Sequence, residues 1–261
     1  MELFRKWGLQ LKKHQFLFEE LVKRDFKKKY KRTILGMLWS LLSPMMQLFI
    51  MSIVFTHFFG QDKAHYTIYL FAGNLTYSFF RDSTYGGMNS LMSNAGIITK
   101  INLPKYMFLL SKNVASLINF GLTLIIFMIF VAVDGIAFSF KFLLLLYPIF
   151  WMIIFNIGCG FILSALFVIF KDIQYLYDIF TLMLMYLSAI FYYTDTYPEH
   201  IQRLFYLNPL YVYITYIREI IIDGIIPDLM VHGLCALYAI LALTVGALIY
   251  KKYNYKFLYY M

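Results

Sequence analysis

Long apolar windows constrain this chain more than any other feature of its sequence. Five of them, at residues 34–59, 106–133, 142–170, 173–193 and 229–250, are long enough to cross a bilayer as helices. A sixth window, at 66–92, is interrupted by Arg81 and Asp82. The composition agrees, because 61% of the residues are hydrophobic and only 14% are charged. We therefore predict an all-α integral membrane protein with six transmembrane helices in a single domain, residues 1–261.

The placement of lysine and arginine predicts the orientation. Eleven of the 23 basic residues precede Thr33, and seven more fall in segments that six crossings from an inside N-terminus place in the cytoplasm. The net charge of +9 is thus explained by topology and requires no nucleic-acid partner. We predict a multi-pass protein of the cytoplasmic membrane with both termini in the cytoplasm.

Residues 1–30 interleave aromatic and aliphatic residues with lysine and arginine, which is typical of an amphipathic helix on a membrane surface. A basic cluster in this region adjoins the first apolar window, and membrane lipids with anionic headgroups are its expected partner. The cluster consists of Lys27, Lys28, Lys29, Lys31 and Arg32. A solvated basic tail is the alternative.

A second short segment, residues 94–105, falls on the predicted cytoplasmic side between the second and third windows. Asn94 is positioned to cap a short helix that Pro104 would end. The apolar side chains of this helix would form a knob below the membrane, which indicates a protein partner. A helix in the headgroup region is the alternative. The candidate docking residues are Asn94, Ile97, Ile98, Lys100, Leu103 and Pro104.

Between the last two windows, residues 194–228 are apolar and aromatic, but too charged and too broken to cross a bilayer. Broken helices survive at membrane depth only inside protein or beside a wet cavity. We therefore predict two short re-entrant helices, within 196–224, that form an outer gate. The alternative is an amphipathic hairpin on the outer leaflet. The candidate gate residues are Tyr197, Pro198, Phe205, Tyr206, Asn208, Pro209, Tyr211 and Tyr213.

Capping signals define the two gate helices. Thr196 and Glu199 predict a capping box, with Pro198 in the first turn, for a helix that ends near Tyr206. Asn208 and Pro209 then predict the start of a second helix, and Gly224 predicts its end.

The sequence carries no nucleotide-binding or catalytic signature. It has no GxxxxGK[ST], HExxH, DxD or GxSxG motif, and its five histidines lack metal-ligand spacing. We expect no catalytic residue, no metal and no cofactor bound by this chain, so that uphill transport would draw its energy from another subunit. Cys159 and Cys235 both fall inside apolar windows, and no disulfide is expected.

Five stretches carry a family resemblance over nearly the whole chain. The first, LVKRDFKKKYKRTILGMLWSLLSPMMQLFIMSIVF at 21–55, combines arginine-aspartate, a basic stretch and Leu-Gly, Trp and Pro. The others are YLFAGNLTYSFF at 69–80, SNAGIITKINLPK at 93–105, FKDIQYLYDIF at 170–180 and YLNPLYVYITYIRE at 206–219. Together they resemble permease subunits of type-2 ABC exporters for polysaccharides and polyol phosphates, the O-antigen, capsule and teichoic acid transporters. One departure is Lys171, where the family more usually has arginine.

The resemblance implies a homodimer of permeases in the inner membrane of a bacterium, docked to two separate ABC ATPase subunits that bind ATP and magnesium. It implies that residues 94–105 are a coupling helix seated in the ATPase. The substrate would be a lipid-linked glycan or polyol-phosphate polymer. The alternatives are a permease for a drug or smaller lipid, a membrane enzyme acting on polyprenyl-linked sugars, and an ion-coupled transporter.

Aromatic rings suit a glycan conduit, because sugars stack their C–H faces on them, although most of the 27 Phe and 23 Tyr must fill lipid-facing belts. Arg81 is expected to face the conduit and attract phosphate, and Asp82 to bond a neighbouring helix; structural pairing of both is the alternative. The predicted conduit residues are Phe79, Phe80, Arg81, Tyr192 and Tyr193.

Overall fold

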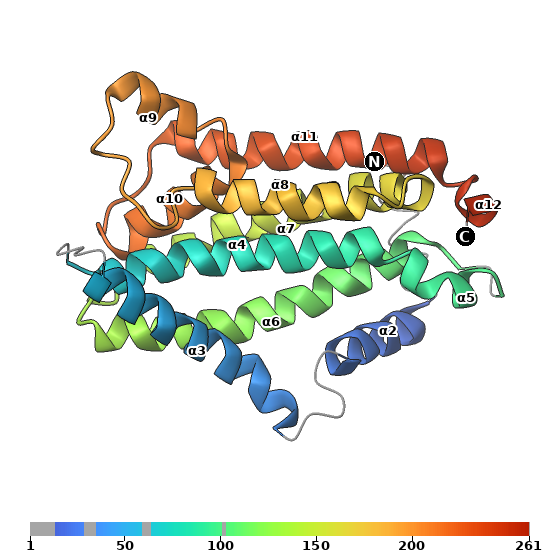
Figure 1. Cartoon of the computed structure of the whole chain (residues 1–261), viewed down its shortest axis with the longest axis horizontal. Helices are drawn as coiled ribbons and strands as arrows, with labels where there is room; N and C mark the ends of the chain where they lie inside the picture. Colours follow the sequence, from blue (N-terminus) through green and yellow to red (C-terminus); the bar gives the residue numbers. More distant parts are fainter. Residues whose placement is uncertain (1–13, 29–34, 59–63, 101–102, 261) are drawn as a thin grey trace.

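The structure, a computed structural model, describes residues 14–28, 35–58, 64–100 and 103–260. Within these ranges the chain is helical and has no strand (Figure 1). The longer α-helices are α2 (Gln15–Lys28), α3 (Trp39–Ser52), α4 (Tyr66–Asn89), α6 (Tyr106–Val133), α7 (Leu146–Ile169), α8 (Ile173–Leu187), α10 (Pro209–Ile221) and α11 (Leu229–Tyr253). The short ones are α5 (Ala95–Ile98), α9 (Glu199–Phe205) and α12 (Phe257–Tyr260).

Part of the predicted N-terminal surface helix is not among the described residues. Residues 1–13 lie outside them, as do Lys29, Lys31, Arg32 and the side chain of Lys28. The described part of that region is α2, which lies beside α6.

Each of the six apolar windows corresponds to a helix, which confirms the all-α membrane class. Tyr106–Val133, Phe140–Ile169 and Leu229–Tyr253 are long and apolar enough to cross a membrane. Trp39–Phe55 and Ile173–Leu187 are shorter apolar helices. Helix α4, with 24 residues, is also long enough to cross a membrane, but the charged pair Arg81 and Asp82 lowers its mean hydropathy. The count of six spans stays a prediction.

Helix α7 is the centre of the bundle and packs along α11 and α4. The backbones touch where glycines meet: a Cβ atom on Gly158 would lie 2.4 Å from the carbonyl carbon of Ala242, and one on Gly246 would lie 2.3 Å from the Gly158 oxygen. Gly87 of α4 approaches α7 in the same way, because its Cβ would lie 3.0 Å from the Cα of Gly160. Small residues allow such close crossings in membrane helices. They make α4, α7 and α11 one closely packed unit.

A separate apolar cluster joins α2, α5, α6, α7 and α12 at one end of the bundle, on the right in Figure 1. Its buried members include Leu21, Ile98, Phe108, Phe161 and Phe257. This cluster therefore ties the surface helix, the predicted coupling segment and the end of the chain together.

We expect Gly158→Ala to destabilise the protein, because its methyl group would overlap the backbone of α11. Overpacking of this kind costs about 1–3 kcal/mol. The control is Gly121→Ala in α6, where the added Cβ has no atom within 4 Å and the better helix propensity of alanine should be neutral or favourable. Thermal unfolding in detergent measures both variants. Equal melting temperatures would contradict the close crossing.

Candidate functional site

Two adjoining cavities form a polar groove between α3, α4 and α6. The larger, of about 540 Å³, is lined by side chains from all three helices. The second, of about 460 Å³, continues toward α2 and reaches Asp25, Lys112 and Asp178. Both cavities are lined by Arg81, Asp82, Ser116 and Asn119, so we treat them as one groove.

Polar side chains line the larger cavity at helical spacing. They are Ser40, Ser43 and Gln47 on α3, Asn74, Ser78 and Arg81 on α4, and Ser116, Asn119 and Thr123 on α6. Each set follows positions i, i+3 or i+4, and i+7, which lie on one face of a helix. Such a surface within apolar helices is compatible with water or a hydroxyl-rich ligand. The sequence analysis missed the eight neutral residues, although the repeated spacing is a signal that could have found them.

Two of the predicted conduit residues line this groove. Arg81 is exposed and contacts both cavities, and Phe79 contacts the larger one while its ring stacks on Phe120 at 4.4 Å. Asp82, expected to bond a neighbouring helix, is also exposed and lines both cavities. Arg81 and Asp82 therefore share one polar surface.

The other three predicted conduit residues do not line this groove. Phe80 is 3% exposed and stacks on Phe155 in the core at 5.8 Å, because each residue turns a helix by about 100°. It therefore faces away from the groove that Arg81 lines. Tyr192 and Tyr193 line neither cavity and lie instead beside the predicted gate.

The backbone after α8 is broken and held by side chains. Ala189 has a positive φ of 50°, so the helix cannot continue. Side chains of α4 and α10 donate to the carbonyl oxygens of this break. These bonds run from Arg218 to Ala189 at 2.9 Å and to Ile190 at 3.1 Å, from Tyr66 to Phe191 at 2.8 Å, and from Tyr69 to Tyr192 at 2.6 Å. These four carbonyl groups therefore have hydrogen-bond donors within the protein.

Arg218 of α10 is the central donor. Its side chain is buried, with the residue only 6% exposed, and its Nε and Nη2 also donate to the Tyr69 carbonyl at 3.2 and 3.0 Å. Its guanidinium carbon lies 3.3 Å from the centroid of the Tyr69 ring. A Cβ atom on Gly73 would lie 2.9 Å from Nη2, so α4 needs glycine there. One buried cation therefore joins α4, α10 and the end of α8.

The first gate helix, α9, begins at Glu199, with Pro198 at its N-cap and not in its first turn as predicted, and it has no capping box. Thr196 donates its hydroxyl to the Tyr193 carbonyl at 3.3 Å, and Glu199 pairs with Arg203 at 2.6 Å. The capping-box prediction was therefore wrong, because both side chains found other partners.

Asn208 caps the second gate helix, α10, as predicted. Its Oδ1 accepts from the Leu210 amide at 3.0 Å, and Pro209 occupies the first turn. Its Nδ2 donates to the Leu187 carbonyl at 3.2 Å and to the Ser188 hydroxyl at 2.9 Å. Asn208 therefore also joins α10 to the end of α8, which capping signals alone could not indicate.

Helix α10 lies inside the protein. Ten of its 13 residues are buried, and it contacts α4, α7 and α11. A hairpin on a leaflet surface would leave one side of this helix exposed, so α10 does not fit that alternative. Helix α9 has no buried residue. Gly224, with a φ of +64°, follows the last turn of α10, where the sequence predicted its end.

Aromatic rings from the break, α9 and α10 form one group. Neighbouring ring centroids lie 5.2 to 6.2 Å apart among Tyr192, Tyr197, Phe205, Tyr206 and Tyr211. Tyr193 packs instead on Tyr69 at 4.1 Å. Tyr213 needs correction: it is fully buried and donates to the Cys235 carbonyl at 2.9 Å, so it belongs to the core.

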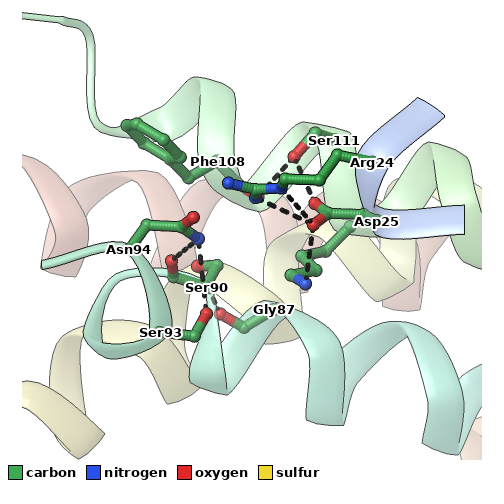
Figure 2. Close-up of polar contacts among 9 residues, drawn as sticks. Arg24, Asp25, Gly87, Ser90, Ser93, Asn94, Phe108 and Ser111 are labelled. Atoms are coloured by element: carbon green, nitrogen blue, oxygen red, sulfur yellow. Dashed lines mark hydrogen bonds and ion pairs between the residues drawn. The ribbon is translucent and has the colours of Figure 1, made fainter. Parts of the chain in front are cut away.

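The predicted docking segment forms a shorter helix than expected. Helix α5 ends at Ile98, and Asn94 does not cap it with its side chain. The Asn94 amide donates instead to the Ser90 carbonyl at 2.7 Å and to the Ser93 hydroxyl at 3.3 Å (Figure 2). Residues 101–102 lie outside the described residues.

Ile98 is not an exposed knob. It is 6% exposed and packs in one cluster with Leu21 and Phe108, because the segment folds back under the bundle. Ile97, Leu103 and Pro104 are partly buried. Among the described residues of this segment, Gly96, Thr99 and Lys100 are exposed, as is Ser93 just before it.

A buried carboxylate attaches α2 to α6. Asp25 is 8% exposed and accepts from Arg24 Nη2 at 2.8 Å, Lys112 Nζ at 3.0 Å and Ser111 Oγ at 3.1 Å (Figure 2). The side chains of the two cationic partners are partly exposed, at 38% for Arg24 and 19% for Lys112, so water screens these ion pairs. Lys27 is exposed beside this attachment. The sequence analysis missed the role of Asp25.

The chain is similar to known membrane transport proteins. Residues 17–222 match the family described as ABC-2 type transporter. Two similar relatives are O-antigen export system permease proteins RfbA of Klebsiella pneumoniae, 27% identical over 255 residues and 28% identical over 247 residues, each covering 93% of this chain and 95% of the relative. A third, of the same name from Myxococcus xanthus, is 24% identical over 221 residues, 84% of this chain and 85% of the relative.

We expect Arg218→Met to destabilise the protein by about 1–3 kcal/mol, because the Ile190 carbonyl would lose its donor, whereas the Ala189 carbonyl would keep the bond from the Tyr69 hydroxyl at 3.2 Å. The matched control is Arg203→Met on α9, whose side chain is 76% exposed and whose ion pair with Glu199 contributes little. Thermal unfolding in detergent separates them. A melting temperature for Arg218→Met equal to that of the control would contradict this role.

Proposed function

This chain belongs to the ABC-2 type transporter family, which it matches over residues 17–222, and on that premise we propose that it exports a lipid-linked polysaccharide across the cytoplasmic membrane of a bacterium. It is a transport subunit, and ATP hydrolysis belongs to a separate subunit, which would bind ATP and magnesium. The family match is the observation that carries the proposal. The names of three relatives, all O-antigen export permeases, support a polysaccharide as the substrate.

We propose six spans, formed by α3 with the π-helical segment Ile53–Phe58 that follows it, α4, α6, α7, α8 and α11, with both chain ends in the cytoplasm. The distribution of basic residues supports this orientation. The pair α9 and α10 would then form the outer gate, with α10 as a re-entrant helix. Its length of 13 residues, about 20 Å, is short of the roughly 30 Å of a hydrocarbon core.

The proposed conduit is the groove between α3, α4 and α6. Its hydroxyl and amide groups suit a polymer rich in hydroxyls, because each sugar can exchange hydrogen bonds with the next site as it slides. Arg81 would attract a phosphate of the lipid-linked end. The aromatic group at the gate would offer stacking surfaces at the exit. A drug or a smaller lipid, or a teichoic acid, is compatible with the family but is less well supported by the relatives' names.

We propose that two copies of this chain assemble with two ATPase subunits. Within one chain, α8 leaves a row of large apolar side chains exposed, which would meet lipid or the second copy. They are Leu176, Ile179, Phe180, Met183 and Leu187. The exposed residues of the segment 93–100 would receive the ATPase, and the buried Ile98 would hold that segment in place.

We expect the purified chain alone to hydrolyse no ATP, and co-expression with its cognate ATPase to give an active complex with two copies of each subunit. Loss of the gene should remove the polysaccharide from the cell surface, and its return should restore it. Mass photometry, ATP hydrolysis and surface staining measure these outcomes. Robust ATP hydrolysis by this chain alone would refute the proposal.

Variants of the docking segment refine this experiment. The double variant Thr99→Asp and Lys100→Glu should lose the ATPase while folding normally, because both side chains are exposed. Ile98→Asp should instead reduce the yield of folded protein, because it would bury a charge. His200→Glu, an exposed change on α9, is the control. Wild-type capture of the ATPase by the double variant would place the docking surface elsewhere.

We expect Arg81→Gln to lower transport severalfold while stability changes by less than about 0.5 kcal/mol, because an exposed groove cation contributes little to folding. Arg81→Lys keeps the charge and should retain most transport. Export per folded molecule in reconstituted vesicles measures the first effect, and thermal unfolding the second. A lower melting temperature with unchanged transport would assign Arg81 a structural role instead.

A further inference from the structure

The end of the chain turns back on the bundle. After the last turn of α11, which carries Lys251 and Lys252, the chain turns and forms α12, which contacts α7 at the same end of the bundle as α5 (Figure 1). We call residues 251–260 the C-terminal hook. Neither the conduit nor the gate includes it.

The hook is held firmly against the bundle. Phe257 is fully buried in the cluster that contains Leu21 of α2, and its ring lies 5.1 Å from that of Tyr250. Lys105, just before α6, donates to the Asn254 carbonyl at 2.6 Å and lies 5.6 Å from the centroid of the Phe257 ring. Burial at this contact lowers the pKa of Lys105 from its ordinary value. The hook therefore has a fixed position at the same end of the bundle as α2.

The outer side of the hook is cationic and aromatic. Lys251, Lys252 and Lys256 are exposed, and no aspartate or glutamate follows Asp228 in the sequence. Three tyrosines lie beside them, Tyr255, Tyr259 and Tyr260, exposed by 72%, 86% and 42%. Among the hook side chains that the structure describes, Phe257 is buried, and the exposed ones are three lysines, three tyrosines and one asparagine.

This combination matches a membrane surface. Lysine near an anionic leaflet is attracted to its headgroups, and tyrosine rings prefer the boundary between headgroups and acyl chains. The surface helix α2, with Phe16 80% exposed and Lys27 exposed, belongs to the same end of the bundle. We propose that the C-terminal hook binds anionic lipid headgroups of the adjacent leaflet and that it holds this end of the bundle at the membrane surface. The proposal rests on the membrane class and not on the transported substrate.

The test uses the full chain in lipid nanodiscs. A nitroxide is attached to Tyr259→Cys in a background with Cys159→Ala and Cys235→Ala, in phosphatidylcholine alone or mixed with phosphatidylglycerol. The anionic lipid should shift the label from contact with a water-soluble nickel complex to contact with oxygen in the bilayer. Replacing Lys251, Lys252 and Lys256 by Gln should reverse this shift and weaken the lipid-bound state about fivefold per lysine, about a hundredfold together.

The matched control replaces the same three lysines by Arg, which keeps the charge and should keep the shift. High salt should weaken it. Thermal unfolding confirms that each variant is folded. A label that is equally accessible to water in both bilayers would overturn the proposal. A label that is protected only when the cognate ATPase is added would also overturn it and would make the hook a protein-docking surface.

Discussion

Broken backbone inside a membrane protein must find donors for its carbonyl groups, and this requirement organises the predicted outer end of the molecule. The chain leaves helical geometry after Leu187, and the carbonyl groups that follow accept bonds from Arg218, Tyr66 and Tyr69. Because these donors sit on α4 and α10, the positions of both helices are set by the break. Helix α10 of the gate packs on α4, and α4 also lines the polar groove. The gate and the groove therefore depend on the same hydrogen bonds.

The sequence predicted the features that are encoded locally. Apolar windows located α3, α4, α6, α7, α8 and α11, and Asn208 with Pro209 located the start of α10, because a cap is a contact between neighbours in the chain. The burial of α10 followed from the same reasoning, since a short, charged helix at membrane depth needs protein around it. These predictions required no knowledge of which helices pack together.

What could not be predicted depends on contacts between distant segments. Ile98 looked like an exposed apolar residue and Phe80 like a conduit residue, but each packs against helices whose position the sequence does not state. The role of Asp25 was missed for the same reason, because Lys112 lies far from it in the sequence. The capping signal at Thr196 failed for a different reason, because Thr196 and Glu199 bond to other nearby residues, Tyr193 and Arg203. The polar stripes along α3, α4 and α6 were visible at helical spacing.

The glycine contacts of α7 have a mechanical consequence. Sliding α7 along α11 would drive backbone atoms together, because Gly158 and Gly246 leave no slack between the helices. In contrast, α3 (Trp39–Ser52) has no glycine and meets α4 through side chains: Leu48 and Met51 pack in apolar clusters with α4 residues, and the Ser52 and Thr67 hydroxyls lie 3.2 Å apart. The bundle thus consists of a rigid unit, formed by α4, α7 and α11, and a more loosely attached helix, α3. Widening the groove therefore requires the least free energy when α3 moves outward while α4, α7 and α11 keep their positions.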